Sequence, residues 1–542
     1  MEAHAQPAAP QLPGLDAPYW PEHFERYYRQ QGAWTGETLD ACIAHHAGHA
    51  PERIAVTDGE RSLTYAELHS RCNQLADGFT RLGLRPGDRI VVQLPNVLEF
   101  IETTFALFRL GVVPVFALPT DRRNEITHIV QASKAVAYLI KDRALGFDYR
   151  EIARELQTLP DAIRHVIVLG EAAEFTPYAS LYGRDLPVPA TDSRAPALIT
   201  LSGGSTAMPK LILRRHDDYL YSIRVSASIC QLSPQSVYLC VLPAGHNFTL
   251  SSPGFIGTLL AGGRVVMQAD PSGSACFASI AREGVTFTAL VPSLAQAWLH
   301  APRQHDLSSL RFLQVGGARL SDEVAARLSE SFDFTLQQVY GMSEGLVCYT
   351  DLKGDLDQLL HTQGRPMSPL DEILVVDDDD LPVAVGQPGH LLVRGPYTIR
   401  GYLDAPQQNA RAFTADGFYR TGDVVCLRED GYLVVTGRHK DQVNRGGEKI
   451  AAEEIEGHLL AHPGVLEAAV IGVPDPHLGE RTCAVLVVAP GQGCDTATLK
   501  AHLQARGVAA QRIPDQFQWL PSLPKTTLGK TDKKVLRQQF AA

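Results

Sequence analysis

The chain of 542 residues lacks several features that would point to particular classes of protein. No uninterrupted apolar run reaches the roughly 20 residues of a membrane-spanning helix. The first residues do not combine a basic start with an apolar core, so we expect neither a secretion signal nor a membrane partner. The nine cysteines are odd in number and never spaced C-x-x-C, which argues against a disulfide framework and a zinc site. We therefore expect a cytoplasmic protein whose cysteines are mostly small buried side chains.

An excess of positive charge is also absent. Lysine and arginine number 49 against 60 aspartates and glutamates, a formal net charge of -11. This balance argues against nucleic acid as a partner. The composition, 45% hydrophobic and 20% charged, is that of an ordinary globular protein. The length exceeds what one hydrophobic core usually supports, so two or more domains are expected.

The chain does contain a long alternation of short apolar runs and segments with helical spacing. The apolar runs lie at residues 88–94, 112–118, 137–140, 165–169, 238–242, 264–267 and 313–315. Such alternation predicts an α/β fold with mainly parallel sheets that helices cover on both faces. From about Glu372 onward, short strands and turns predict a β-rich subdomain. The acidic run at residues 377–380 is expected to be a solvated turn within it.

A polar, basic and glycine-bearing segment at residues 437–449 predicts a linker. Beyond the linker, helical and strand patterns alternate again. We expect helices at residues 452–460 and 499–506 and strands at residues 470–473 and 484–488. We therefore expect an N-terminal domain at residues 1–437, a hinge at residues 438–445 and a small, mobile α+β domain at residues 446–542.

A loop rich in glycine and hydroxyl groups follows the apolar run at residues 197–201. Its sequence is Ser202-Gly203-Gly204-Ser205-Thr206-Ala207-Met208-Pro209-Lys210. Glycine lets backbone N–H groups turn toward an anion, hydroxyls add donors and lysine supplies a positive charge, which together suit the phosphates of a nucleotide. The spacing of a Walker A loop is absent. Taken alone, the segment is explained equally well as an ordinary turn.

Four further motifs follow this loop along the chain. They are Gly341-Met342-Ser343-Glu344-Gly345, Tyr419-Arg420-Thr421-Gly422-Asp423, the linker at residues 437–449 and Gly529-Lys530. The set and its order resemble the adenylate-forming superfamily of acyl- and aryl-CoA synthetases and peptide-synthetase adenylation domains, over nearly the whole chain. In that chemistry a carboxylate attacks the α-phosphate of ATP. Because both groups are anionic, the resemblance implies Mg²⁺ and lysine charges that offset their repulsion.

The resemblance also implies roles for individual residues. Ser202 to Lys210 would close over the leaving pyrophosphate, and Glu344 would hold Mg²⁺ with Ser343 near the α-phosphate. Asp423 would accept hydrogen bonds from the ribose hydroxyls, and Arg438 would contact the ribose. The remaining nucleotide-binding residues would be Gly316, Gly317, Ala318, Tyr340, Gly341 and Met342, with the tyrosine offering a π-face to the adenine.

By the same resemblance, Lys530 would enter the active site from the C-terminal domain and bridge the attacking carboxylate and the α-phosphate. The domain would then rotate about a hinge at Lys440 so that a thiol reaches the acyl-adenylate. Taken alone, Lys530 is one more solvated lysine. The chain departs from the family at Ala207 and Met208, where glycine and often threonine are usual, and the loss of a glycine should stiffen the loop.

Residues 243–254 resemble the stand-alone aryl-acid ligases of siderophore assembly. His246 would lie beside the reacting carboxylate, and Asn247 would bind the hydroxyl next to it. Ser252 would reach a 3-hydroxyl, and Val347 would form part of the wall against the ring. Salicylate-activating relatives tend to carry cysteine at the position of Ser252, so the serine favours 2,3-dihydroxybenzoate, and salicylate stays open.

The interpretation is an aryl-acid–AMP ligase that passes its product to the phosphopantetheine thiol of an aryl carrier protein. No carrier domain with its serine is evident, so a separate carrier protein is expected. The alternatives are a salicylate–AMP ligase, a benzoate-type CoA ligase and a non-catalytic nucleotide-binding regulator. The regulator is an alternative because Ala207 and Met208 depart from the family pattern in the phosphate loop. The argument against it is the presence of Lys210, Glu344, Asp423 and Lys530.

Overall fold

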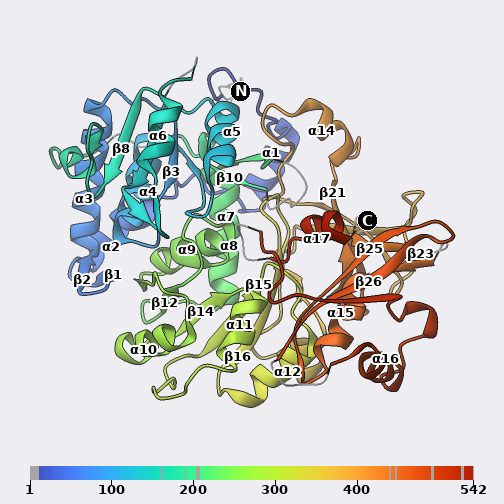
Figure 1. Cartoon of the computed structure of the whole chain (residues 1–542). Coiled ribbons are helices and arrows are strands. Elements are labelled where there is room, and N and C mark those ends of the chain that lie inside the picture. The colour runs from blue at the N-terminus through green and yellow to red at the C-terminus, as the bar shows by residue number, and fades with distance from the viewer. Residues whose placement is uncertain are drawn as a thin grey trace.

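The computed structural model describes residues 11–159, 163–188, 191–202, 208–438, 441–445, 448–489, 494–526 and 530–540, without the side chains of residues 448 and 449. A large N-terminal body holds two sheets with helices between and around them, and a smaller body at the C-terminus packs against one side of it (Figure 1).

Nine described strands form the larger sheet, in the spatial order β18 (Arg365–Pro366), β17 (Val347–Tyr349), β16 (Thr335–Gly341), β15 (Phe312–Gly316), β14 (Phe287–Leu290), β12 (Val237–Cys240), β13 (Arg264–Met267), β1 (Ile54–Asp58) and β2 (Arg61–Thr64). Its central strands pair in parallel, and the outer strands β2, β17 and β18 pair antiparallel.

The second sheet runs in the order β11 (Leu211–Arg215), β10 (Pro196–Leu201), β4 (Val113–Phe116), β3 (Arg89–Gln93), β5 (Ala137–Lys141), β8 (His165–Leu169) and β9 (Thr176–Pro177). It is parallel except at β11, which pairs antiparallel with β10. The predicted α/β fold class with mainly parallel sheets is confirmed.

Helices form three layers around these two sheets. Between the sheets lie α3 (Tyr65–Arg81), α4 (Leu98–Leu110), α7 (His216–Ile229), α8 (Asn247–Ser251) and α9 (Gly254–Leu260), within one continuous apolar core. The outer face of the larger sheet packs against α10 (Gly273–Glu283), α11 (Pro292–Trp298), α12 (Asp322–Ser331) and α13 (Leu356–His361). The outer face of the second sheet packs against α5 (Arg123–Ser133) and α6 (Arg150–Leu156).

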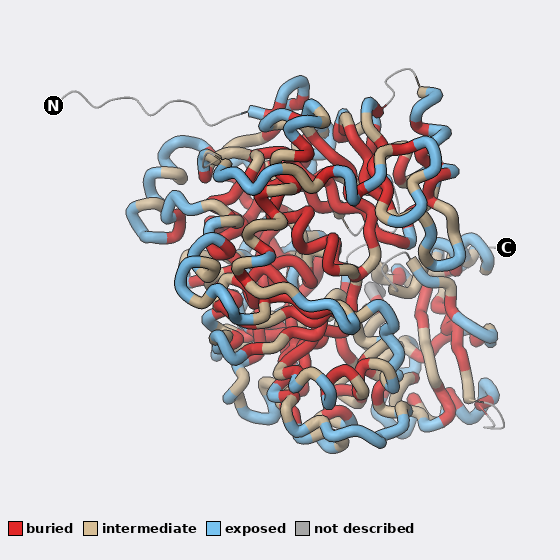
Figure 2. The backbone as a smooth tube through the Cα atoms, turned by 90° about the vertical axis from the view of Figure 1, so that its left-hand side faces the viewer, coloured by how far each residue is buried: buried red, intermediate tan, exposed pale blue. Residues whose placement is uncertain are grey.

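The sequence explains how the inner helices form. Thr64 caps α3: its hydroxyl accepts from the Glu67 N–H, and the Glu67 carboxylate accepts from the Thr64 N–H, which together form a capping box. Helix α4 is buried continuously from Leu98 to Arg109, as expected of a helix with a sheet on each side. Figure 2 shows the buried segments concentrated in the middle of the molecule.

The β-rich segment forms an antiparallel sheet of β19 (Glu372–Val376), β20 (Pro388–Arg394), β21 (Tyr419–Leu427) and β22 (Leu433–Arg438). The acidic run at residues 377–380 is an exposed turn after β19, as predicted. The remaining N-terminal elements are α1 (Glu22–Gln30), α2 (Ala41–His49), α14 (Pro406–Ala412), the 3₁₀ turn η1 (Tyr178–Leu181) and the hairpin of β6 (Arg143–Ala144) and β7 (Phe147–Asp148).

The small C-terminal body is built on a sheet of β24 (Glu448–Ile450), β23 (Val443–Arg445), β26 (Gly479–Val488), β25 (Val465–Asp475) and β27 (Gln516–Trp519). One face packs against α15 (Ala452–Leu460) and α16 (Thr496–Ala505), followed by a short turn η3 (Ala510–Arg512). The other face packs against α17 (Lys533–Phe540) through Leu536. Helices on both faces give this part of the chain its own apolar core.

All nine cysteines are free thiols, and eight of them are buried, as predicted from their scattered spacing. No helix in the described part of the chain has the length and apolar character needed to cross a bilayer.

Candidate active site

A cleft of about 740 Å³ lies between the large body and the small one. Its floor lies at the carboxyl ends of β15 and β16, the edge of a parallel sheet where α/β proteins bind ligands. Of the predicted site residues, it is lined by Gly317, Ala318, Tyr340, Gly341, Asp423, Arg438 and Lys530. The two bodies therefore share one cleft, and six of the predicted nucleotide-binding residues line it together with Lys530.

Glycines at the end of β15 allow close packing at this floor. A Cβ on Gly316 would lie 2.6 Å from the Val339 carbonyl oxygen and 3.1 Å from the Phe248 ring. Gly317 has a φ of +82°, a conformation that favours glycine, and a Cβ there would meet Lys530 Cε at 4.0 Å. Side chains at these two positions would strain the backbone and narrow the cleft.

Asp423 lies at the centre of a small hydrogen-bonded group on the β-rich sheet. Its Oδ2 accepts from the Tyr340 hydroxyl at 2.6 Å, and its Oδ1 accepts from Arg438 Nε at 2.9 Å. The β21–β22 register places Asp423 directly opposite Arg438. Burial, followed by the Asp423 charge, raises the pKa of Tyr340 well above its usual value, so this phenol stays protonated and keeps donating.

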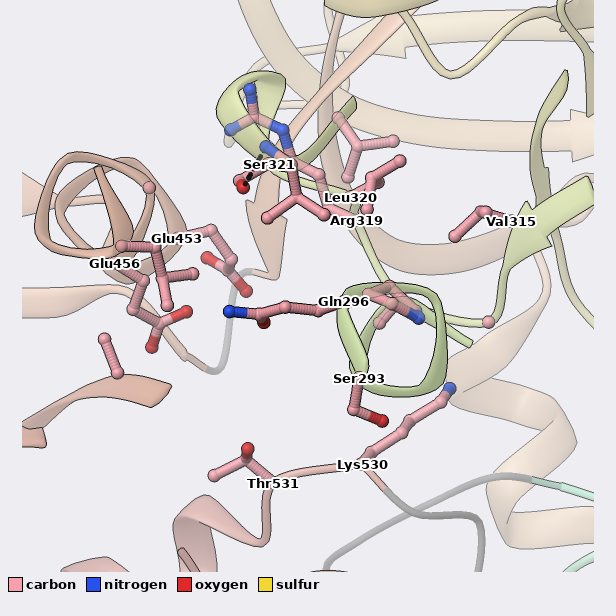
Figure 3. A pocket seen from close by; sticks show the side chains of 18 of the residues that line it. Ser293, Gln296, Val315, Arg319, Leu320, Ser321, Glu453, Glu456, Lys530 and Thr531 are labelled. Atoms are coloured by element: carbon pink, nitrogen blue, oxygen red, sulfur yellow. Dashed lines mark hydrogen bonds between the residues drawn. The ribbon is translucent and has the colours of Figure 1, made fainter. Parts of the chain in front are cut away.

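Lys530 lies shortly before α17, next to a pair of bridged residues. Lys525 and Thr531 pair as an isolated antiparallel bridge, and the Thr526 N–H donates to the Lys530 carbonyl at 2.7 Å. Figure 3 shows the Lys530 side chain beside α11, the helix that carries Ser293 and Gln296. The lysine is also close enough to His246 for its charge to affect that imidazole. The structure thus brings Lys530 to the floor of the cleft.

His246 and Asn247 begin α8, the helix after β12. His246 Nδ1 accepts from the Phe248 N–H at 3.3 Å and caps the helix. Burial, with the Lys530 charge adding to it, lowers the pKa of His246 to about 4, so the imidazole is neutral near pH 7. The Tyr219 hydroxyl donates to Asn247 Oδ1 at 2.8 Å, which directs the amide nitrogen of Asn247 away from α7.

Ser252 and Val347 lie near the same tyrosine. Ser252 is buried at the end of α8, and its hydroxyl affects the pKa of Tyr349, which burial raises well above its usual value. Val347 and Tyr349 are two residues apart on β17, so their side chains share a face of the sheet. A Cβ on Gly341 would lie 3.3 Å from Val347 Cγ2, which places Val347 directly opposite the nucleotide-binding motif.

Glu344 and Lys210 are linked through Tyr402. The buried Tyr402 hydroxyl donates to Glu344 Oε1 at 2.8 Å, and Lys210 Nζ lies 4.3 Å from the centroid of the Tyr402 ring. The backbone beside Glu344 is fixed by Arg214 Nη1, which donates to the Ser343 carbonyl at 3.0 Å. The backbone of Met342 also closes a turn, because its carbonyl accepts from the Gly345 N–H at 3.2 Å.

The carboxylate of Glu344 suits Mg²⁺, a hard cation that binds oxygen. The described residues contain no group of three or more side chains able to hold a metal. A single buried carboxylate fits a nucleotide-bound Mg²⁺, because this ion usually takes one or two carboxylates and fills its other positions with phosphate oxygens and water. The Glu344 carboxylate is therefore chemically suited to hold the Mg²⁺ of a bound nucleotide.

Polar contacts join the two bodies around the cleft. Gln296 Nε2 on α11 donates to the Leu466 carbonyl at 3.1 Å, and Arg506 Nη1 lies 3.3 Å from Glu323 Oε1 on α12. Gly437, at the end of the β-rich sheet, has a φ of +149°, and a Cβ there would lie 2.5 Å from Glu453 Oε2 on α15. The small body is thus held with Lys530 toward the cleft floor.

Several predicted residues fall outside the described part of the chain. These are Gly203, Gly204, Ser205, Thr206 and Ala207 of the phosphate loop, the hinge residue Lys440, and Gly446, Gly447 and Gly529 of the motifs. At the edges of the loop, Met208 is exposed and the Ser202 hydroxyl accepts from the Lys210 N–H at 3.0 Å.

Three residues outside the motifs also shape the site. They are Tyr219, Tyr402 and Asn96. Asn96 is buried, and its Nδ2 lies within 3.0–3.2 Å of the carbonyls of Cys240, Val241, Leu242 and Gln268. Its Oδ1 accepts from the Ala244 N–H at 2.8 Å, so Asn96 fixes the loop that leads to His246. The pair Pro95-Asn96 after a buried strand was the available signal for this role.

Comparison with known proteins agrees with this geometry. A family model described as AMP-binding enzyme matches residues 43–403, and one described as AMP-binding enzyme C-terminal domain matches residues 454–530. The chain is 51% identical over 524 residues to the 2,3-dihydroxybenzoate-AMP ligase of Bacillus subtilis, with 96% of this chain and 97% of that protein covered.

Two mycobacterial proteins are similarly related. The chain is 46% identical over 523 residues to the salicyl-AMP ligase / salicyl-S-ArCP synthetase of Mycobacterium tuberculosis, with 95% of this chain and 92% of that protein covered. The apo structure of MbtA from Mycobacterium smegmatis superposes with a TM-score of 0.76 at 46% identity, with 97% and 99% covered. The predicted resemblance is confirmed: the chain belongs to the AMP-binding enzymes and is an adenylate-forming ligase.

Proposed function

We propose that the enzyme activates 2,3-dihydroxybenzoate with ATP and transfers the aryl group to a separate aryl carrier protein in siderophore biosynthesis. A carboxylate oxygen attacks the α-phosphorus of ATP, the bond to pyrophosphate breaks, and aryl-AMP forms. The phosphopantetheine thiol of the carrier then attacks the acyl carbon, loses its proton and displaces AMP. Because the reaction consumes ATP, we place it in the cytoplasm.

The observation that carries this proposal is the approach of Lys530 to His246 and Gly317. A lysine from the small body reaches the floor of a cleft whose walls are the proposed nucleotide site. There its charge would offset the repulsion between the substrate carboxylate and the α-phosphate. A neutral His246 beside Lys530 would hydrogen-bond the substrate carboxylate without adding a second positive charge.

The nucleotide would occupy the remaining walls. Asp423 would accept from the ribose hydroxyls, with Arg438 alongside, and Tyr340 would face the adenine with Gly316, Gly317 and Ala318. Lys210 and Ser343 would contact the phosphates, together with the loop that begins at Ser202. Mg²⁺ held by Glu344 would neutralise phosphate charge when bound.

The acid would lie between α8 and β17. The Asn247 amide would meet the 2-hydroxyl, the buried Ser252 would meet the 3-hydroxyl, and Val347 would pack against the ring. The Ser252 hydroxyl offers a 3-hydroxyl a hydrogen bond of about 1 kcal/mol that salicylate cannot make, so this site favours the dihydroxylated acid. Salicylate is the second candidate, because a relative named salicyl-AMP ligase is 46% identical to this chain.

The test is ATP–pyrophosphate exchange with benzoate, salicylate, 2,3-dihydroxybenzoate and 3-hydroxybenzoate. We expect the highest kcat/KM with 2,3-dihydroxybenzoate. The highest value with salicylate would overturn the choice of acid, and absence of exchange with every acid would favour a regulator that binds nucleotide without turnover. Transfer to free coenzyme A with the efficiency of carrier loading would favour a CoA ligase.

A further inference from the structure

Tyr402 lies between two residues of opposite charge at the phosphate end of the site. Its hydroxyl donates to Glu344 Oε1 at 2.8 Å, while Lys210 Nζ lies 4.3 Å from the centroid of its ring. Among the ion pairs of the described residues, none joins Glu344 to Lys210, although both contact the Tyr402 side chain. Tyr402 thus contacts both charges, the carboxylate through its hydroxyl and the ammonium group through its ring.

The position of Tyr402 is fixed on all sides. Its side chain is buried, and its hydroxyl lies 3.0 Å from that of Tyr419, the first residue of β21. Its N–H donates to Asn409 Oδ1 at 2.7 Å, and its carbonyl accepts from Asn409 Nδ2 at 2.9 Å. Ile399, on the same segment, donates its N–H to the Glu344 carbonyl at 2.7 Å. The ring therefore cannot turn aside without disturbing the backbone around Glu344.

The chemistry of these contacts differs for the two charges. The hydroxyl binds one carboxylate oxygen and leaves the other Glu344 oxygen for a cation. The face of an aromatic ring attracts an ammonium group more weakly than a phosphate does, so Lys210 can leave the ring when nucleotide arrives. A direct Lys210–Glu344 ion pair in this enclosed place would instead have to be broken before either residue could act.

We propose that Tyr402 is a positioning residue that keeps Lys210 and Glu344 from neutralising each other. It holds the lysine ready for the phosphates and orients the carboxylate for Mg²⁺. This inference rests on the proposed function, because it assumes that Lys210 and Glu344 meet the phosphates and the metal of bound ATP.

The test compares Tyr402→Phe with Tyr402→Leu by calorimetric titration of ATP, with and without Mg²⁺ and without any aryl acid, so that no turnover occurs. Phenylalanine keeps the ring and loses the hydroxyl. We expect its ATP affinity to fall about tenfold with Mg²⁺ and to stay within about twofold of the wild type without it, as loss of one hydrogen bond to a charged group implies.

Leucine removes both contacts and lets Lys210 pair with Glu344. We expect ATP affinity without Mg²⁺ to fall about tenfold in Tyr402→Leu and to recover in the double variant Tyr402→Leu/Glu344→Gln, because a neutral amide cannot hold the lysine. Recovery distinguishes positioning from a general packing defect, which a second substitution would not repair.

Tyr178→Phe is the matched control. Tyr178 is a buried tyrosine whose hydroxyl donates to a carboxylate, Glu102 Oε1 at 2.9 Å, and neither residue lines the cleft. Its ATP affinity should equal that of the wild type under both conditions. Equal losses with and without Mg²⁺ in Tyr402→Phe, or no recovery in the double variant, would overturn the inference on Tyr402 alone. Failure of the wild type to bind ATP would overturn the proposed function as well.

Discussion

Arg438 Nε lies 2.9 Å from Asp423 Oδ1, and the two residues face each other across the β21–β22 pairing. The other oxygen of the same carboxylate accepts from Tyr340. Both oxygens are therefore oriented before any nucleotide arrives, by partners on the β-rich sheet and on the larger parallel sheet. Such preorganisation is how a binding site gains selectivity for hydroxyl groups.

Replacing Asp423 with alanine should remove the enzyme's preference for ribose. We expect the wild type to use ATP at least tenfold better than 2′-deoxy-ATP, and Asp423→Ala to lose about 10- to 100-fold with ATP but much less with the deoxynucleotide. The measurement is kcat/KM for each nucleotide in pyrophosphate exchange. Asp416→Ala, an exposed acid of the same region, is the control. Equal losses with both nucleotides would contradict a ribose contact.

Replacing Lys530 with alanine should separate the two half-reactions. The lysine is needed where two anions meet, so adenylation should fall by 100-fold or more. Transfer of the aryl group from preformed aryl-AMP to the carrier should change less than about threefold. Lys534→Ala, an exposed lysine on α17, is the control. Similar losses in both half-reactions would show that Lys530 supports the fold or a step common to both.

A structural feature of this protein can be predicted from the sequence when the residues that form it are close together along the chain. The capping box at Thr64 and Glu67 is a contact within one helical turn, and the alternation of apolar runs predicts the parallel sheets. The link from Lys210 through Tyr402 to Glu344 was not predictable, because it joins residues 58 or more positions apart. Only the packing of β-rich and parallel sheets brings these residues together.

Removing the ion pair between the bodies should weaken adenylation only slightly. Arg506 contacts Glu323 on α12 and donates from Nε to His458 Nδ1 at 3.2 Å. Partly exposed pairs contribute little, so Arg506→Ala should lower exchange by about twofold to fivefold and leave transfer from aryl-AMP unchanged or faster. Arg512→Ala, whose partner Glu454 lies within the small body, should change neither. A loss in both half-reactions would argue against the view that this contact favours only the orientation of the small body in which adenylation occurs.

Loss of the Tyr219 hydroxyl should reduce discrimination among acids. Without this donor the Asn247 amide can rotate, and a 2-hydroxyl loses its oriented partner. We expect Tyr219→Phe to reduce the preference for 2,3-dihydroxybenzoate over 3-hydroxybenzoate about fivefold to tenfold, with KM for ATP unchanged. Tyr221→Phe, on the same helix with its hydroxyl against Ser368, should keep the wild-type preference. An unchanged preference in Tyr219→Phe would contradict this role.

His216 should make the protein less stable in mild acid. Burial lowers its pKa to about 4, against weaker opposing effects of Asp40 and Asp192, and its Nδ1 accepts from the Leu39 N–H at 3.2 Å. The unfolded chain takes up this proton first, so stability is complete above about pH 6.5 and falls as the pH decreases toward 4. The expected loss at pH 5 is about 2 kcal/mol relative to pH 8.

The measurement is urea unfolding of the wild type and His216→Asn at both pH values. Asparagine can still accept from Leu39 but does not titrate, so its loss between pH 8 and pH 5 should be about 2 kcal/mol smaller. Parallel pH dependences in the two proteins would show that another group is responsible.

The proposed acid-binding residues lie on α8 and β17, whereas Asp423 and Arg438 lie on β21 and β22. Selection of the acid and handling of ATP are thus encoded by separate stretches of chain that meet only in the folded protein. Mutations in one stretch can therefore change which acid is accepted while the energy-supplying chemistry is inherited intact. This separation gives evolution, and protein engineers, a direct route to ligases for new aromatic acids.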